Sequence, residues 1–260
     1  ATKSEEAKKR DKSREETPRQ LRNLQKEKVM RINKVILSLI LMCIGLPTAA
    51  SNPDDLSQET TDSVFVAQNA TEIFCSLPKQ ILELIPTRLR RDMTDYYLQA
   101  DSIHKVTNNL GGTSHLIDLT DDYLKVQVTD VSTMEIKMLP FKEQQIAAVV
   151  YTICGEAADS KFSFFDEYTQ ELKSEKFFKA PQLKDFFSIP RGSLTTMKEI
   201  EQMVEFCTIE YRLNASDNSL HAYLTIDKHI NQDDYNIIKL FMLDSLVYDW
   251  NGKKYITRKQ

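Results

Sequence analysis

The stretch QIAAVVYTIC, residues 145–154, is a continuous apolar run in a chain of mixed polarity. A short uninterrupted run that is rich in valine and isoleucine is typical of a strand buried on both faces. Two segments before it alternate between apolar and polar residues, DYLKVQVTD at 122–130 and STMEIKMLPF at 132–141. Alternation of this kind predicts neighbouring strands with one face on a core. The three segments together therefore predict the middle of a β-sheet.

Tight turns join further strand-like segments into hairpins. Turn dipeptides occur at Gly111-Gly112, at Asp217-Asn218 and at Asn251-Gly252, each between apolar segments, and such dipeptides favour hairpin connections. No long helix separates consecutive strands, which disfavours a doubly wound nucleotide-binding fold. We therefore predict an α+β fold in which N-terminal helices are followed by a mostly antiparallel, hairpin-rich sheet with one further helix.

The helices are expected before the sheet and again near the C-terminal end. Asn69 can cap a helix through NATEIF, with Glu72 as its capping-box partner. Helical spacing between Pro78 and Pro86 predicts a second short helix, and a third is expected over 87–99. After an irregular segment at 181–192, the spacing predicts the further helix over 194–206 and a short helical piece after Asn231.

Charge divides the chain into a basic leader and an acidic remainder. The whole chain has a net charge of −4, and residues 1–50 contain twelve basic and six acidic residues, a charge of +6. Residues 51–260 therefore carry −10. Nucleic-acid binding needs a basic surface, so nucleic acid is not expected as a partner of this acidic part.

The segment MRINKVILSLILMCIGLPTAA, residues 30–50, has the layout of a secretory signal. Arg31 and Lys34 precede an apolar core at 35–46, and small residues follow Pro47. The apolar core is shorter than the roughly 20 residues that a membrane-spanning helix needs. We predict cleavage after Ala50, export to the periplasm or cell envelope, and no transmembrane span after cleavage; the alternative is an uncleaved anchor behind a cytoplasmic tail.

The signal-like segment and the composition on either side of it divide the chain into four predicted parts. Residues 1–29 are a charged leader that we interpret as an extension before the natural start at Met30, and residues 30–50 are the signal peptide. Residues 51–68 are polar and are expected to be a flexible lead-in. Residues 69–260 are expected to form a single α+β domain, with two small subdomains that divide near 180–192 as the alternative.

Three stretches resemble a known family. They are IFCSLPKQILELIPTRLRRDMTDYY, VTNNLGGTSHLIDLTDDYLKVQVTDVSTMEIKMLP and AVVYTICGEAADSKFSFFDEY. They are similar to a Bacteroidetes family of secreted proteins, domain-of-unknown-function family 3256. The resemblance covers residues 69–178 well and the rest loosely. It implies a signal peptide followed by one α+β domain, and it implies no activity, cofactor or catalytic residue.

Catalytic candidates are few. Cys154 ends the apolar run before Gly155, and His104, His115 and Asp121 are the other residues that could join it in a hydrolase site. A nucleophilic cysteine needs a histidine or another cation beside it to lower its thiol pKa, and none is near in sequence. The histidines are scattered, so we predict no metal site and no cofactor, and we favour a non-enzymatic protein.

Binding candidates lie in a helix and in the last hairpin. Tyr248 and Trp250 lie beside the Asn-Gly turn and could stack on a glycan ring, although such aromatic residues often pack on a core. Arg90 and Arg91 concentrate positive charge and could meet an acidic partner, although a solvated helix face is the alternative.

Covalent modification is expected at two places. Ser63 lies in an Asp-Ser-Val triplet that exported Bacteroidetes proteins can use for O-glycosylation, a role that depends on the family resemblance. Cys154 and Cys207 are the most plausible disulfide pair, with buried free thiols as the alternative.

The sequence thus favours an exported, periplasmic or envelope-associated module that binds another envelope protein or a glycan. The alternatives are an envelope hydrolase with a site assembled from distant residues, and a small-ligand carrier that uses the concave face of the sheet. An apolar pocket of about 300 Å³ or more would favour the carrier.

Overall fold

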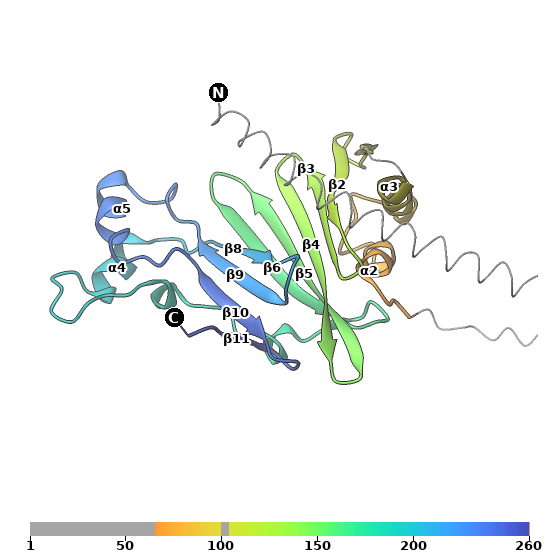
Figure 1. Cartoon of the computed structure of the whole chain (residues 1–260). Coiled ribbons are helices and arrows are strands. Elements are labelled where there is room, and N and C mark those ends of the chain that lie inside the picture. Colours follow the sequence, from red (N-terminus) through yellow and green to blue (C-terminus); the bar gives the residue numbers. More distant parts are fainter. Residues whose placement is uncertain (1–65, 100–103, 260) are drawn as a thin grey trace, which may run out of the picture. The chain divides into compact units, whose positions relative to one another are not determined.

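Two antiparallel sheets and four short α-helices form the fold in the computed structural model, which describes residues 66–99 and 104–259 (Figure 1). All described residues belong to one compact unit of the chain. The leader, the predicted signal peptide with its cleavage site and Ser63 lie outside the described residues. Within the described ranges, no helix has both the length and the apolar character needed to cross a membrane.

The first sheet has seven strands that lie side by side in chain order, each antiparallel to the next. Consecutive strands are neighbours because short turns connect most of them, as the sequence predicts. Its strands are β1 (Val106–Thr107), β2 (Thr113–Leu119), β3 (Tyr123–Thr129), β4 (Ser132–Phe141), β5 (Gln144–Cys154), β6 (Ala158–Phe165) and β7 (Glu171–Leu172).

The second sheet has four strands in the order β11-β10-β9-β8, again all antiparallel. Its strands are β8 (Ile209–Leu213), β9 (Ser219–Leu224), β10 (Leu246–Trp250) and β11 (Tyr255–Thr257). The turn between β10 and β11 contains Gly252 at φ 83°, a conformation that glycine adopts without strain. The predicted α+β class with hairpin-rich antiparallel pairing is confirmed.

Strand β5 is buried on both faces, as its apolar sequence predicts. Ala147 and Val149 face one hydrophobic core, whereas Ile146, Ala148 and Val150 face another. A strand between two cores needs apolar side chains at every position, which explains why its sequence does not alternate.

The helices are short and capped by side chains at their N-termini, with one exception. They are α2 (Ala70–Ser76), α3 (Thr87–Gln99), α4 (Met197–Met203) and α5 (Gln232–Ile238). Asn69 and Asn231 cap α2 and α5 as predicted, and Thr196 caps α4. The predicted bounds of α3 are confirmed, but no side-chain cap begins that helix.

The predicted second helix between Pro78 and Pro86 is wrong. Residues 77–86 form a series of turns between α2 and α3. The carbonyl oxygens of Leu77, Leu82 and Ile85 accept hydrogen bonds from the buried guanidinium of Arg90. An irregular segment leaves carbonyls without the amide partners of a helix, and Arg90 stabilises the irregular path because it supplies donors to these carbonyls.

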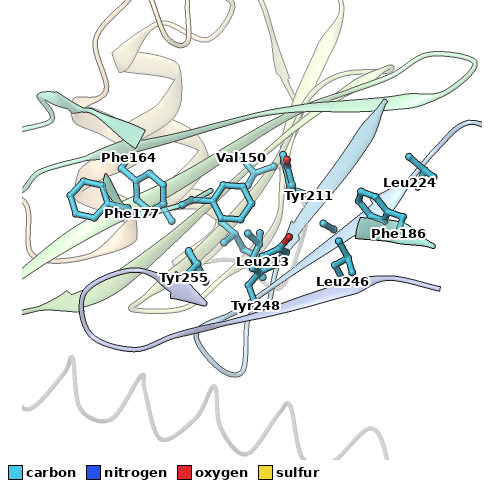
Figure 2. Close-up of a cluster of buried hydrophobic side chains, with 14 of the residues drawn as sticks. Val150, Phe164, Phe177, Phe186, Tyr211, Leu213, Leu224, Leu246, Tyr248 and Tyr255 are labelled. Atoms are coloured by element: carbon cyan, nitrogen blue, oxygen red, sulfur yellow. The ribbon is translucent and has the colours of Figure 1, made fainter. Parts of the chain in front are cut away.

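The seven-stranded sheet separates two cores. One core lies on the face covered by α2 and α3 and includes Phe74, Met93, Val126 and Phe165. The other lies between the two sheets and holds aromatic side chains from both (Figure 2). The ring centroid of Phe164 is 5.1 Å from that of Phe177 and 6.4 Å from that of Tyr255. The fold is therefore layered as helices α2 and α3, first sheet and second sheet, with Ile200 of α4 and Ile238 of α5 in the core between the sheets.

Strand β8 is an edge strand whose free amides are satisfied by side chains of the first sheet. The amide nitrogens of Ile209, Tyr211 and Leu213 donate to Asp159 Oδ1, Ser160 Oγ and Glu135 Oε2 at 3.2, 3.0 and 2.7 Å. Unpaired strand edges are sites of unwanted association. Here the alternate amides of β8 dock its edge onto the first sheet instead.

Tyr255 lies in the aromatic core with a buried hydroxyl that has no hydrogen-bond partner among the described residues. An unsatisfied buried hydroxyl costs about 1–3 kcal/mol. We expect Tyr255→Phe to raise the free energy of unfolding by about 1 kcal/mol in urea denaturation. The matched control is Tyr248→Phe, because the buried Tyr248 hydroxyl bonds the Thr257 side chain, and it should lower that free energy. Equal destabilisation by both variants would contradict this account.

Candidate functional site

The catalytic candidates of the sequence do not come together. Cross-strand pairing places His115 of β2 in line with Thr152 of β5, three strands away. At about 4.8 Å per strand, this separation is about 14 Å. Cys154 lies two residues further along β5. Hydrogen-bonded catalysis needs contact at about 3 Å, so Cys154 and His115, two candidate members of the alternative hydrolase site, are too far apart to act together.

The other members of that predicted site are also dispersed. His104 precedes β1, beyond β2 as seen from Cys154, and its ring stacks on Tyr96 with the ring centroids 3.9 Å apart. Asp121 is exposed in the turn between β2 and β3. No group of three or more histidine, cysteine or acidic side chains suited to a metal ion occurs within residues 66–99 and 104–259.

The aromatic binding candidates belong to the core. Tyr248 is only 5% exposed and packs against Phe178, with the ring centroids 5.1 Å apart. Trp250 packs against the same core and donates its indole N–H to the Pro140 carbonyl at 2.7 Å. The prediction that Tyr248 stacks on a glycan is therefore wrong, because no ligand ring can reach a side chain that the core covers.

The two arginine candidates differ. Arg90 is 1% exposed and donates only to main-chain carbonyls, so its predicted contact with an external partner is wrong. Arg91 is exposed on α3, and its role in binding stays a prediction.

The three cysteines of the described chain are free thiols. Cys154 and Cys207 are both exposed, so the disulfide predicted between them is not formed in this structure. Cys75 is half-buried on α2, and burial raises the pKa of its thiol. The pKa of the Cys207 thiol is also raised, because neighbouring atoms remove part of its solvent and the nearby Asp159 charge acts in the same direction. A raised thiol pKa opposes nucleophilic chemistry at these positions.

A cleft of about 230 Å³ lies on the helix-side face of the first sheet, where β4, β5 and β6 are adjacent. Its floor consists of the apolar side chains of Met134, Val149 and Phe165 from these three strands. They lie on one face because residues of an antiparallel sheet alternate between faces, and cross-strand pairs share a face.

One wall of the cleft comes from the irregular segment 77–86. Gln80 and Ile81 lie on this segment and line the cleft. The segment is held by Arg90, whose Nε donates to the Ile85 carbonyl at 2.6 Å and whose Nη2 donates to the Leu82 carbonyl at 2.9 Å. Arg90 therefore positions the wall without contacting the interior of the cleft.

Ser163 places a hydroxyl in the cleft. This side chain is on β6 directly opposite Val149, and the residue is 6% exposed. The buried polar atoms without a hydrogen-bond partner in the described residues are His115 Nδ1 and Tyr255 Oη, and the Ser163 hydroxyl is not one of them. Ser163 therefore adds a polar residue to the lining of the cleft.

Lys161 and Tyr151 form the polar side of the cleft. They are direct cross-strand partners on β6 and β5. The Lys161 side chain is 71% exposed, and its ammonium lies 4.0 Å from Glu171 Oε1. The Tyr151 hydroxyl donates to Ser132 Oγ at 3.2 Å, which leaves the Tyr151 oxygen free to accept. Apolar and polar groups thus converge on one small open space.

The sequence analysis overlooked these cleft residues, although a signal was present. In KFSFF, the period of two places Lys161, Ser163 and Phe165 on one face of the strand and Phe162 and Phe164 on the other. A lysine and a serine on a face whose neighbouring residues are apolar indicate that other elements cover this part of the sheet only incompletely. The second wall, at Gln80 and Ile81, had no such signal because it depends on a turn segment.

Comparison with known proteins identifies a family and a fold. The model of a family described as "Protein of unknown function (DUF3256)" matches residues 63–255. No curated protein matches the chain. A solved structure, a domain of an uncharacterized protein from Porphyromonas gingivalis W83, is similar with a TM-score of 0.66 and 19% sequence identity. The match covers 75% of this chain and 100% of that chain, and at this identity it concerns the fold alone.

Proposed function

This chain belongs to the DUF3256 family of proteins of unknown function, as its sequence predicted, and on that premise we propose that it is an exported module that binds a partner protein of the cell envelope. The observation that carries the proposal is the cleft on the first sheet, with an apolar floor at Met134, Val149 and Phe165 and polar groups at one side. Such a combination suits recognition of a side chain that a partner presents.

The volume of the cleft favours a partner side chain over an enclosed small ligand. Pockets for small molecules commonly measure about 300–1,000 Å³, and this cleft has about 230 Å³. The cleft is therefore smaller than the usual range for an enclosed small molecule. One large apolar side chain fills such a space, whereas the small-ligand carrier needs more. Anchoring residues of this size dominate many protein interfaces.

Export supports a partner in the envelope. The proposal of export is supported by the signal-like segment at 30–50 and by the acidic charge of the chain after it. N-terminal sequencing of the protein from its own cells is expected to begin at Ser51. A mature chain that still carries the apolar segment would contradict export by cleavage.

A peptide selection tests the proposed binding site. Random displayed peptides are selected for binding to the protein, which is expressed from its full 260-residue sequence. We expect the selected peptides to share one large apolar residue. Ser163→Phe fills the cleft from strand β6 and should weaken binding of these peptides at least tenfold, which corresponds to about 1.4 kcal/mol. Fluorescence polarisation measures the affinity.

Ser216→Phe is the matched control for this test. It adds the same phenyl group at an exposed position in the turn between β8 and β9, away from the cleft. Its affinity for the peptides should equal that of the unchanged protein. Selected peptides that bind Ser163→Phe and Ser216→Phe equally well would overturn the cleft as the binding site, and so would a selection that yields no binding peptide.

A further inference from the structure

We propose that the partner of the cleft binds as an extended strand along the edge of β6, an inference that rests on the proposed function and specifies the conformation of the bound polypeptide. The main chain of the partner pairs with β6, and one of its side chains enters the cleft. Two observations support this inference. Strand β6 has main-chain groups without a hydrogen bond among the described residues, and the same strand lines the cleft.

Strand β7 covers only one end of β6. Strand β6 has eight residues, Ala158–Phe165, whereas β7 pairs only with the last two of them. After Leu172 the chain leaves the sheet through a 3-10 helix over Ser174–Lys176. Because β7 is the last strand on this side of the first sheet, the rest of the β6 edge has no neighbouring strand within the described ranges.

The main-chain groups that point outward from this edge belong to the even-numbered residues of β6. Successive residues of an antiparallel strand point their N–H and C=O groups to opposite sides, and the Asp166 amide bonds across the β6-β7 turn at 3.0 Å. The Ala158 carbonyl also points outward, since it accepts the Thr225 hydroxyl at 2.5 Å. Between these positions, the main-chain groups of Ser160 and Phe162 have no hydrogen bond to any described residue.

The second sheet leaves this part of the edge open. The Tyr211 amide of β8 donates to Ser160 Oγ, and the Leu213 amide donates to Glu135 Oε2 on β4. Strand β8 therefore lies across the face of the first sheet and not along its edge. Ser160 and Phe162 are both partly exposed. Because unpaired main-chain groups are unfavourable away from water, those of these two residues face solvent and can pair with an added strand.

The cleft lies beside the same edge. Lys161, Ser163 and Phe165 are alternate residues of β6, and all three line the cleft. A residue of the added strand directly across from Lys161 shares its face, and the Cβ atoms of such a pair are about 4.5–5.5 Å apart. A large apolar side chain at that position lies next to Lys161 and Ser163. One strand can thus supply both the main-chain pairing and the side chain that the cleft accepts.

Lys161 makes the edge selective without closing it. Its side chain is 71% exposed, and its ammonium is 4.0 Å from Glu171 Oε1, a solvated pair that contributes little. The ammonium can therefore move when a strand arrives. A lysine on a sheet edge discourages pairing with unrelated strands, so a partner needs a further contact, and the cleft supplies it.

N-methylated peptides test the main-chain pairing. The probe is the tightest-binding peptide of the displayed-peptide selection, synthesised with a methyl group on one main-chain nitrogen at a time. We expect methylation at alternate positions of the bound segment to weaken binding about tenfold or more, because every second N–H of an added strand bonds β6. Methylation at the intervening positions is the matched control and should leave the affinity nearly unchanged. Fluorescence polarisation measures the affinities.

Amide hydrogen exchange of the protein of full sequence locates the strand. The saturating peptide should slow exchange at Ser160 and Phe162 about tenfold or more, because their amides gain a hydrogen bond. The amides of Lys161 and Ser163 point toward β5 and should change little.

Two results would overturn the strand proposal and leave the proposed function intact. One is a methylation profile without a period of two. The other is equal slowing at all four amides, which indicates general stabilisation by the peptide. In both cases the sensitivity of peptide binding to Ser163→Phe still decides the proposed function. A selection that yields no binding peptide overturns the proposed function and this inference with it.

Discussion

Arg90→Met is expected to lower the free energy of unfolding by about 3 kcal/mol and to loosen the wall of the cleft. Arg90 is 1% exposed and contacts no carboxylate among the described residues. Its guanidinium donates instead to four main-chain carbonyls, those of Phe74, Leu77, Leu82 and Ile85, at 2.6–3.1 Å. Each buried acceptor left without a donor costs about 1–3 kcal/mol, and partial access of water reduces the total.

Burial lowers the pKa of Arg90, but an arginine remains charged in a protein. The cation is stabilised by carbonyl dipoles alone, at the C-terminal end of α2 and along the segment 77–86. Arg90→Lys should recover only part of the stability, because one ammonium cannot reach four acceptors in the geometry of a planar fork. Urea denaturation gives the free energies.

Arg91→Met is the matched control for Arg90→Met. It removes an exposed arginine from the next position of α3, and surface substitutions of this kind usually change stability by less than about 0.5 kcal/mol. The variants should also differ in amide hydrogen exchange of residues 77–86, which should become faster in Arg90→Met alone. Similar stability of the two variants would mean that Arg90 does not organise this segment.

The same arginine shows why part of the fold could not be predicted from sequence. The strands were predictable because their patterns are local in the sequence: DYLKVQVTD alternates between apolar and polar residues, and QIAAVVYTIC is a continuous apolar run. The helix expected between Pro78 and Pro86 failed because its carbonyls bond a side chain that follows in another helix. Sequence periodicity indicates which face of an element is apolar, but it does not indicate a hydrogen bond between separate elements.

The candidate site was less predictable than the fold for the same reason. Ser163 and Val149 are neighbours only through strand pairing, and Gln80 joins them only through the turn segment. Tyr248 and Trp250 looked like ligand contacts because a turn dipeptide follows them, whereas the second sheet turns both toward the core. Whether an aromatic residue of the β10-β11 hairpin is exposed depends on which face of the second sheet packs on the first sheet. A local sequence pattern does not contain this information.

The second large effect is expected at Glu135, where the two sheets meet. Glu135 is 4% exposed on β4. Its Oε2 accepts the Leu213 amide at 2.7 Å, and its Oε1 lies 2.7 Å from the Lys125 ammonium. Glu135→Ala leaves that amide and the ammonium without this partner. Breaking a buried pair from one side costs about 3–5 kcal/mol, and we expect about 3 because Lys125 is partly open to water.

Lys137 provides an internal comparison, because it is also buried on β4 and also reaches the second sheet. Its ammonium is 2.8 Å from Asp122 Oδ2 and donates to the Ala215 carbonyl at 3.0 Å. Lys137→Met should cost only about 1 kcal/mol, since it removes the desolvation cost of a buried cation and leaves Asp122 in solvent. Hydrogen exchange locates the effect: Glu135→Ala should speed exchange at Leu213 more than at Tyr211, whose amide bonds Ser160. Equal acceleration at both amides would mean that Glu135 stabilises the protein globally and does not anchor the edge of β8.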